Sequence, residues 1–314
     1  MSAHDVTAPR VTEQRAGEIF ESTKRWGRWG PDDERGALNL LTTERVTRAA
    51  SLVRTGELVP CGREFPVTPA PDNPFPAQHH MVIAGDVLND HDDQACADYV
   101  GVFFHGMSVS HLDALCHWSI KRQIYNGYPA SSVTSRGAQR NSLVAAFDGI
   151  VGRGVLLDIP RTLGIDWLNP GEAMGVDTLD AACADQDVTI EPGDILLVST
   201  GRDARRSVHG AWDPDTVGLA GLHPECATWL LERDIAVLGC DGVSDPLPKN
   251  THDFPFPLHV CCLVGMGVYM LDNLRLDRLA RSCEAAGRWE FMFAVSPLQI
   301  VGGTGSPVNP VAIL

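Results

Sequence analysis

The chain has 314 residues, of which 44% are hydrophobic and 21% are charged, so it is long enough to bury a sizeable core. It carries 40 acidic against 25 basic residues, a formal net charge of −15. Such an acidic surface repels nucleic-acid phosphates and anionic lipids, which argues against nucleic-acid and membrane partners. We see no signal-like apolar segment and no run of the about 20 apolar residues that a bilayer span needs, and therefore expect a cytoplasmic protein.

Two helices are predicted near the start of the chain. A helical period covers residues 13–29, and a second one covers residues 43–51 after an N-cap at Thr42 or its neighbour. We expect residues 1–60 to form an N-terminal helical arm that packs on a main domain of residues 61–314.

Strands and helices alternate in the middle of the chain. Short apolar runs bounded by turn residues predict buried strands, and segments with helical spacing lie between them. Because this alternation favours crossover connections, we expect a single α/β domain with a mixed sheet. The predicted strands are 100–109, 154–158, 195–198, 235–239, 264–271, 291–295 and 299–301, and the predicted helices are 177–184 and 222–232.

The most informative segment holds three of the 11 histidines, His105, His111 and His117, together with Asp113. In extended chain, side chains alternate between faces, so His105, His111 and Asp113 would share one face. Imidazole nitrogen beside carboxylate oxygen is a common donor set for zinc, manganese or iron. The segment therefore predicts a metal site around His111 and Asp113. The alternative is a set of solvated histidines, or of histidines satisfied in the core.

The same segment resembles the signature of the metal-dependent cyclase-like hydrolases, a family that includes bacterial kynurenine formamidase and isatin hydrolase. The family pattern, H-x-G-T-H-x-D-x-P-x-H, is matched at His111, Asp113 and His117. It is not matched at Met107, where the family has a metal-binding histidine, or at Leu115, where proline is usual.

A later block supports the resemblance. Phe256 opens a Phe-Pro-Leu-His sequence that matches the family's F-P-x-H, and Asp272 stands where the family has a metal-binding glutamate. The resemblance implies a swivelling β/β/α fold and a Zn or Mn ion held by His111, Asp113, His259 and Asp272. It also implies a homo-oligomer, either a dimer or a tetramer.

The resemblance further implies hydrolysis of a small-molecule amide, lactone, imide or ester by a metal-activated water, whose pKa falls from about 15.7 toward about 7. His117 would then serve as the general base or acid. Because a thioether is a poor ligand for a hard ion, Met107 leaves two outcomes open. Either the site holds one ion where relatives hold two, or His105 reaches the metal through a bulge. We expect one ion, with His105 acting in catalysis by contacting the substrate or the water.

Two other functions are open on the same residues. A chain that kept the fold but lost part of the site would be a non-catalytic small-molecule binding protein. The same metal and proton carrier would also suit elimination, as in a lyase or dehydratase. Asp241 and Asp245 follow a predicted strand end and are candidates to orient metal-bound histidines.

Overall fold

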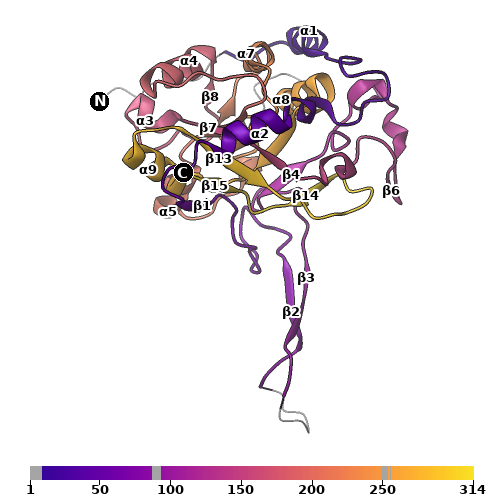
Figure 1. The fold of residues 1–314 in the computed structure, drawn as a ribbon, viewed down its shortest axis with the longest axis vertical. Helices are drawn as coiled ribbons and strands as arrows, with labels where there is room; N and C mark the ends of the chain where they lie inside the picture. Colours follow the sequence, from indigo (N-terminus) through magenta and orange to yellow (C-terminus); the bar gives the residue numbers. More distant parts are fainter. Residues whose placement is uncertain (1–8, 87–92, 249–253, 255) are drawn as a thin grey trace.

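The computed structural model describes residues 9–86, 93–248, 254 and 256–314. Within these residues, a nine-stranded mixed sheet runs through the body of the molecule (Figure 1). Its strands are β1 (Leu58–Pro60), β4 (His111–Asp113), β7 (Ile150–Asp158), β9 (Ile195–Ser199), β11 (Val237–Cys240), β12 (Tyr269–Asp272), β13 (Glu290–Val295), β14 (Gly305–Pro307) and β15 (Val311–Ile313). The strand order is β1-β15-β13-β7-β9-β11-β12-β4-β14.

The four central strands, β7, β9, β11 and β12, are parallel, and antiparallel strands flank them on both sides. The helices are α1 (Glu13–Thr23), α2 (Thr43–Ala50), α3 (Ile159–Leu163), α4 (Val176–Asp185), α5 (Arg202–His209), α6 (Pro214–Val217), α7 (Cys226–Arg233), α8 (Pro257–His259), α9 (Asp277–Ala286) and the π-helix η5 (Val260–Met266). Short 3-10 turns are η1 (Gly36–Leu40), η2 (Tyr125–Gly127), η3 (Ala130–Ser132) and η4 (Leu143–Ala146). The smaller strand pairs are β5 (Val133–Thr134) with β6 (Gly137–Ala138), and β8 (Ala173–Met174) with β10 (Gly221–Leu222).

The central strands explain why the sheet lies in the core. The side chains of β9 and β11 are buried along their whole length, as continuous apolar runs predict for parallel strands covered on both faces. Helices provide the crossovers, with α3 and α4 between β7 and β9, and α5 to α7 between β9 and β11. The predicted α/β domain with a mixed sheet is confirmed. Within the described ranges, no helix combines the length and apolar character that crossing a bilayer requires.

The N-terminal segment is tied to this sheet by β1, which pairs with β15. Its first helix is shorter than predicted, because α1 ends at Thr23 and Lys24 is already extended. The indole Nε1 of Trp26 donates to the Val264 carbonyl at 2.7 Å, so contact with η5 replaces the helical period there. Thr42 caps α2, as predicted. The division at residue 60 stays a prediction.

Two predicted strands in the last third of the chain are wrong in whole or in part. Residues 264–266 belong to η5, and β12 begins only at Tyr269, after Gly267 leaves the helix with a φ of 73°. A short apolar run does not by itself distinguish a buried helix from a buried strand. Residues 299–301 lie outside the sheet, which β14 and β15 complete instead. The strand predicted at 291–295 is confirmed as β13.

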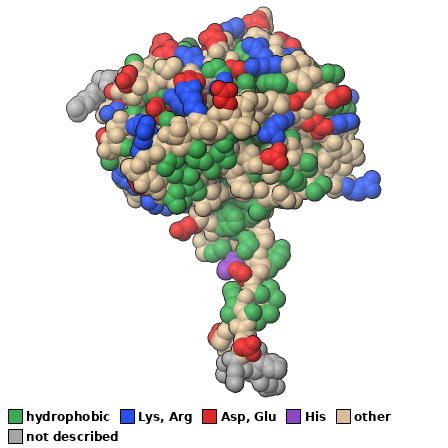
Figure 2. All heavy atoms as spheres, in the orientation of Figure 1, with side chains coloured by type: hydrophobic (Ala, Val, Ile, Leu, Met, Phe, Trp, Pro, Cys, Tyr) green, Lys and Arg blue, Asp and Glu red, His purple; other side chains and the backbone are tan. Residues whose placement is uncertain are grey.

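The strand predicted over residues 100–109 is also wrong. The chain there ends β3 (Ala97–Gly101), which pairs with β2 (Gln78–Ile83) in a separate two-stranded sheet, and it bends before β4 begins. The β2–β3 hairpin projects from the body (Figure 1), with hydrophobic side chains along it (Figure 2). Its exposed apolar residues are Met81, Val82, Ile83, Tyr99 and Val100. The predicted homo-oligomer stays a prediction.

The central position of β4 can be tested at Leu112, which is fully buried between two strands. Leu112→Ala leaves a cavity that cannot fully collapse, and we expect it to lower the free energy of unfolding by about 3 kcal/mol. Urea denaturation measures the change. The matched control is Leu298→Ala at an exposed site, which should change the free energy by less than about 0.5 kcal/mol. Equal effects of the two substitutions would contradict the central position of β4.

Candidate metal centre

Strand β4 brings the predicted residues together by its register. His111 lies opposite Asp272 of β12, and Asp113 lies two residues further along β4, on the same face as His111. His259 ends the short helix α8, on the connection between β11 and β12. Residues far apart in the sequence therefore converge at the antiparallel edge of the sheet.

Asp113 lies at the centre of four imidazoles. Its Oδ1 atom is 2.9 Å from Nδ1 of His105 and 3.5 Å from Nε2 of His111. The same oxygen is 3.9 Å from Nε2 of His117. The other oxygen, Oδ2, is 3.7 Å from Nε2 of His259. The two carboxylate oxygens thus face different sets of nitrogens.

The possible ligand atoms form two groups that share Asp113. One group is His105, His111 and Asp113, and the other is Asp113, His259 and Asp272; within each group the atoms lie within 4.8 Å of one another. Nε2 of His259 is 3.3 Å from Oδ2 of Asp272. All of the metal ligands expected from the sequence lie in these groups, and His105 joins them.

The polar atoms of these groups fit a cation. Asp113 is fully buried, and neither of its oxygens accepts a hydrogen bond from the part of the chain that the structure describes. Oδ1 of Asp272 and Nδ1 of His105 are also buried and lack a hydrogen-bond partner there, although Nδ1 lies close to Asp113. Buried carboxylates without donors are unfavourable. A divalent ion would satisfy them, and a set of nitrogen and oxygen donors suits zinc or manganese.

Hydrogen bonds orient two of the imidazoles. Nδ1 of His111 lies 2.8 Å from the Val109 carbonyl, so its proton is held there and Nε2 is left facing Asp113. Nδ1 of His259 lies 2.6 Å from Asp245, as expected for a residue that orients a metal-bound histidine. Asp241, the other candidate for this role, instead accepts hydrogen bonds from the backbone and hydroxyl of Thr200.

Burial and charge act in opposite directions on the pKa values of the site. Burial lowers the pKa of His117 to about 4, although the charge of Asp113 opposes the shift. For Asp113 itself, burial would raise the pKa, but the surrounding imidazoles outweigh it and hold the pKa below its usual range. Burial would also lower the pKa of His259, but hydrogen bonds to Asp245 and Asp272 raise it well above the ordinary value. His117 is therefore a neutral imidazole, able to accept a proton, at pH 7.

Met107 does not take the place of the missing histidine. Its side chain packs against an apolar cluster of Leu219, Val243 and Leu247. The chain between β3 and β4 bends, so the alternation expected for an extended strand does not hold there. His105 instead comes close to Asp113 from this loop, and its ring stacks on that of His117 with centroids 4.0 Å apart.

Sequence analysis did not identify Asn273, which holds this loop in place. Its Nδ2 atom donates to the carbonyls of Gly106 at 2.7 Å and Val109 at 3.2 Å. Its Oδ1 atom accepts from Nη1 of Arg202 at 2.6 Å. Its φ of 55° is in the left-handed region, which asparagine tolerates better than most residues. Its signal in the sequence is its place directly after Asp272, at the start of an Asn-Leu pair like the one that follows the metal-binding glutamate in the family.

Among the described residues, the candidate centre is most accessible to solvent at His105 and His117. The side chains of His105 and His117 are 17% and 21% exposed, whereas those of His111 and Asp113 are at most 3% exposed. Aromatic rings stand around this part of the centre. Phe104 lies 4.5 Å from the His105 ring, and Trp118 lies 5.8 Å from the His117 ring and packs edge-on against Phe256. The two most exposed imidazoles of the candidate centre therefore lie beside aromatic rings.

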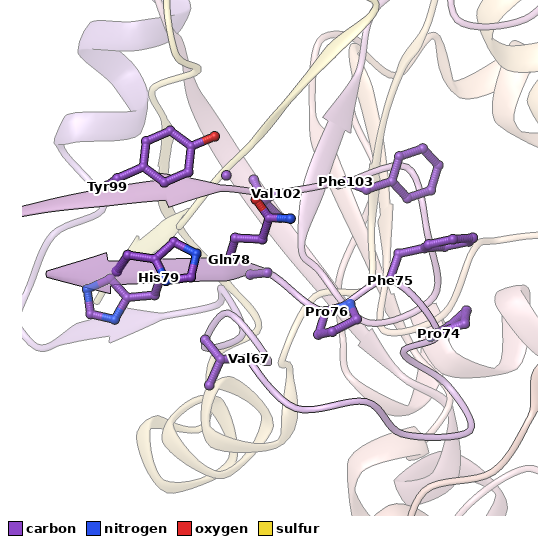
Figure 3. Close-up of a pocket in the computed structure, with 12 residues that line it drawn as sticks. Val67, Pro74, Phe75, Pro76, Gln78, His79, Tyr99, Val102 and Phe103 are labelled. Carbon is purple, nitrogen blue, oxygen red and sulfur yellow. The ribbon is translucent and has the colours of Figure 1, made fainter. Parts of the chain in front are cut away.

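A hollow of about 710 Å³ lies at the base of the β2–β3 hairpin (Figure 3). It is lined by aromatic and imidazole side chains, among them Phe75, His79, Tyr99 and Phe103. His79 pairs with Asp98 across the hairpin at 2.9 Å. None of the residues in the two ligand groups lines this hollow, so the chemistry of the candidate centre lies elsewhere.

The anchoring role of Asn273 generates a prediction. Asn273→Ala leaves the Gly106 and Val109 carbonyls without this donor. It also places alanine, whose side chain can form no hydrogen bonds, at a position with left-handed backbone conformation. We expect a loss of about 3 kcal/mol in unfolding free energy. Hydrogen exchange of residues 105–110 should become faster. Asn273→Gly relieves the backbone strain but does not restore the lost hydrogen bonds. Compared with Asn273→Ala, it should therefore recover only about 1 kcal/mol of the free energy of unfolding. Full recovery by glycine would contradict the anchoring role.

Comparisons with known proteins agree with the fold described above. The family model Cyclase, described as "Putative cyclase", matches residues 58–245. A solved structure described as a novel cyclase superposes with a TM-score of 0.82 at 30% sequence identity, covering 94% of this chain and 99% of that one. No curated protein matches the sequence.

Two more distant structures share the fold. An isatin hydrolase bound to the product analogue thioisatinate has a TM-score of 0.59 at 18% identity, with 84% of this chain and 94% of that chain covered. A "predicted metal-dependent hydrolase" from Bacillus stearothermophilus has a TM-score of 0.50 at 16% identity, with 82% and 97% covered. From the family match and the 30% identical structure, the chain belongs to the Cyclase family, in agreement with the resemblance carried by its histidine and aspartate motifs.

Proposed function

We propose that this protein is a metal-dependent hydrolase that cleaves a small amide, lactone, imide or ester with an activated water. The observation that carries the proposal is the buried Asp113 carboxylate, which has no hydrogen-bond donor among the described residues and faces four imidazoles. A structural core seldom tolerates a buried carboxylate whose two oxygens accept no hydrogen bond, because burial without hydrogen bonds is unfavourable. A cation removes that difficulty.

The ligands we propose are the two groups that share Asp113. His105, His111 and Asp113 would hold one divalent ion, and Asp113, His259 and Asp272 would hold a second. Of the two outcomes that the sequence left open for Met107, this geometry favours the one in which His105 reaches the metal. When bound, zinc or manganese lowers the pKa of a water molecule and polarises a substrate carbonyl.

His117 is proposed as the proton carrier. Its ring lies at the more accessible part of the centre, stacked on His105, and its Nε2 atom is 3.9 Å from Asp113. Because its pKa is lowered to about 4, it is unprotonated at neutral pH and can accept a proton from the attacking water. The same imidazole can then deliver that proton to the leaving group.

The surroundings of His105 and His117 favour a flat substrate. Phe104, Trp118 and Phe256 offer ring faces and edges beside the imidazoles. The isatin hydrolase with this fold is bound to thioisatinate, an analogue of its product. We therefore propose cyclic amides and imides fused to, or carrying, an aromatic ring as the first substrates to examine.

Substitutions separate the proposed ligands from the proton carrier. We expect His111→Ala to lose bound metal, because Nε2 of His111 is a ligand atom. We expect His117→Ala to keep its metal while kcat falls by about 10² to 10⁴. Metal content by inductively coupled plasma spectrometry and turnover measure the two effects. His79→Ala, on the exposed hairpin, is the control and should change neither. Full activity of His117→Ala would contradict its role.

A hydrolysis screen tests the proposed activity itself. The protein is stripped of metal and reloaded with Zn or Mn separately, and ring-opening of isatin, cyclic imides, lactones and aryl formamides is followed. We expect turnover of at least one of these classes, restored by the metal and carrying oxygen from ¹⁸O-labelled water. Unsaturated products without labelled oxygen would identify a lyase. A reloaded protein that binds these compounds without turnover would identify a binding protein.

A further inference from the structure

Arg202, the first residue of α5, is a buried cation that forms no direct ion pair with a carboxylate in the described part of the chain. Its residue surface is 5% exposed. Nη1 donates to the Asp241 carbonyl and to Oδ1 of Asn273, and Nη2 donates to the Met107 carbonyl. All of these acceptors are neutral, and Nε has no acceptor among the residues that the structure describes. A buried guanidinium normally faces a carboxylate or another anion.

Arg205, about one helical turn further along α5, also has a buried N–H group, at Nη1, without a hydrogen-bond acceptor in the described chain. Its guanidinium carbon lies 4.2 Å from the ring centroid of Trp212, and that of Arg202 lies 5.9 Å from the same ring. The indole stabilises the positive charge of both side chains but accepts no hydrogen bond in the plane of their N–H groups. Two cations therefore gather at one indole with N–H groups still unpaired.

The acidic residues nearby are engaged elsewhere. The Asp241 carboxylate accepts from the backbone N–H groups of Thr200 and Arg202 and from the Thr200 hydroxyl. Asp203 pairs with Arg63. Asp72 likewise pairs with Arg206. Neither Arg202 nor Arg205 therefore forms an ion pair with a carboxylate among the described residues, although the charges of Asp241, Asp203 and Asp72 act on Arg202 through space.

Both arginines line a small cavity next to these unpaired groups. Its other walls include Thr200, Trp212, Leu219 and Gly242, and no acidic side chain lines it. The cavity is small, with room for roughly one particle of the size of a water molecule. A single atom-sized ligand fits this space, whereas a sulfate or an organic substrate does not.

We propose that this cavity binds one monovalent anion of chloride size, which accepts hydrogen bonds from Nε of Arg202 and Nη1 of Arg205. A water molecule would satisfy the donors but would bring no negative charge to the two guanidinium groups. Arg202 also holds the Met107 carbonyl and Asn273, so the anion would stabilise the loop that carries His105. This site is separate from the proposed metal centre, and its test does not depend on catalysis.

Thermal unfolding of the full chain, as purified, tests the proposal in sodium chloride and in sodium gluconate at equal ionic strength. We expect Tm to be higher in chloride by roughly 2 °C or more, with a saturable dependence on chloride. Arg205→Gln should abolish the difference between the salts. Arg206→Gln, the matched control on the same helix, should retain it, because Arg206 pairs with Asp72 and does not line the cavity. Equal Tm values in the two salts for the unsubstituted protein would overturn the proposal.

Crystals grown in sodium bromide give an independent measurement. We expect an anomalous peak between the guanidinium groups of Arg202 and Arg205, which is absent in Arg205→Gln. Density for water alone, or a peak without any effect of chloride on Tm in solution, would overturn the proposal. A larger effect of sodium acetate than of chloride would also overturn it, since that result would identify a carboxylate subsite.

Discussion

The carboxylate of Asp113 is shielded from solvent, and this burial determines which groups can surround it at the candidate metal centre. Asp113 is fully buried, and its charge is tolerable in such a place only if positive groups or a cation surround it. The protein supplies four imidazoles from β4, from the loops on either side of it, and from α8. The pairing of β4 with β12 sets Asp272 beside this cluster, and a shift of one residue in that register would turn the ligands of β4 to the opposite face.

A second set of contacts gives this arrangement its rigidity. Asn273 donates hydrogen bonds to two carbonyls of the loop that carries His105, and Arg202 in turn donates a hydrogen bond to Asn273. The Ser110 hydroxyl donates to the Asn273 carbonyl at 2.6 Å, so both sides of the same residue are held. These polar groups lie between the candidate metal centre and the arginine-lined cavity. The two sites therefore share structural support, although they differ in charge and chemistry.

The sequence predicted the parts of this structure that depend on local patterns. The buried strands β7, β9 and β11 follow from continuous apolar runs, and the pair His111 and Asp113 follows from period-two spacing. His259 and Asp272 could be expected only through the family resemblance, because nothing local joins them to β4. The proximity of His105 was expected from a strand that does not exist; a bent loop places it instead. The role of Arg202 depends on contacts with residues far away in the chain, which no local pattern encodes.

The position of the projecting hairpin has a consequence for the loop that carries His105. β3 ends at Gly101, and only three residues separate it from His105. Both faces of the hairpin carry exposed side chains, so the body of the protein does little to restrain it. His105 therefore follows the exposed hairpin after a short connection, whereas His111 is paired within the sheet with β12 on one side and β14 on the other. The backbone of His111 is thus held by strand pairing on both sides and that of His105 is not, although both imidazoles face the same oxygen of Asp113.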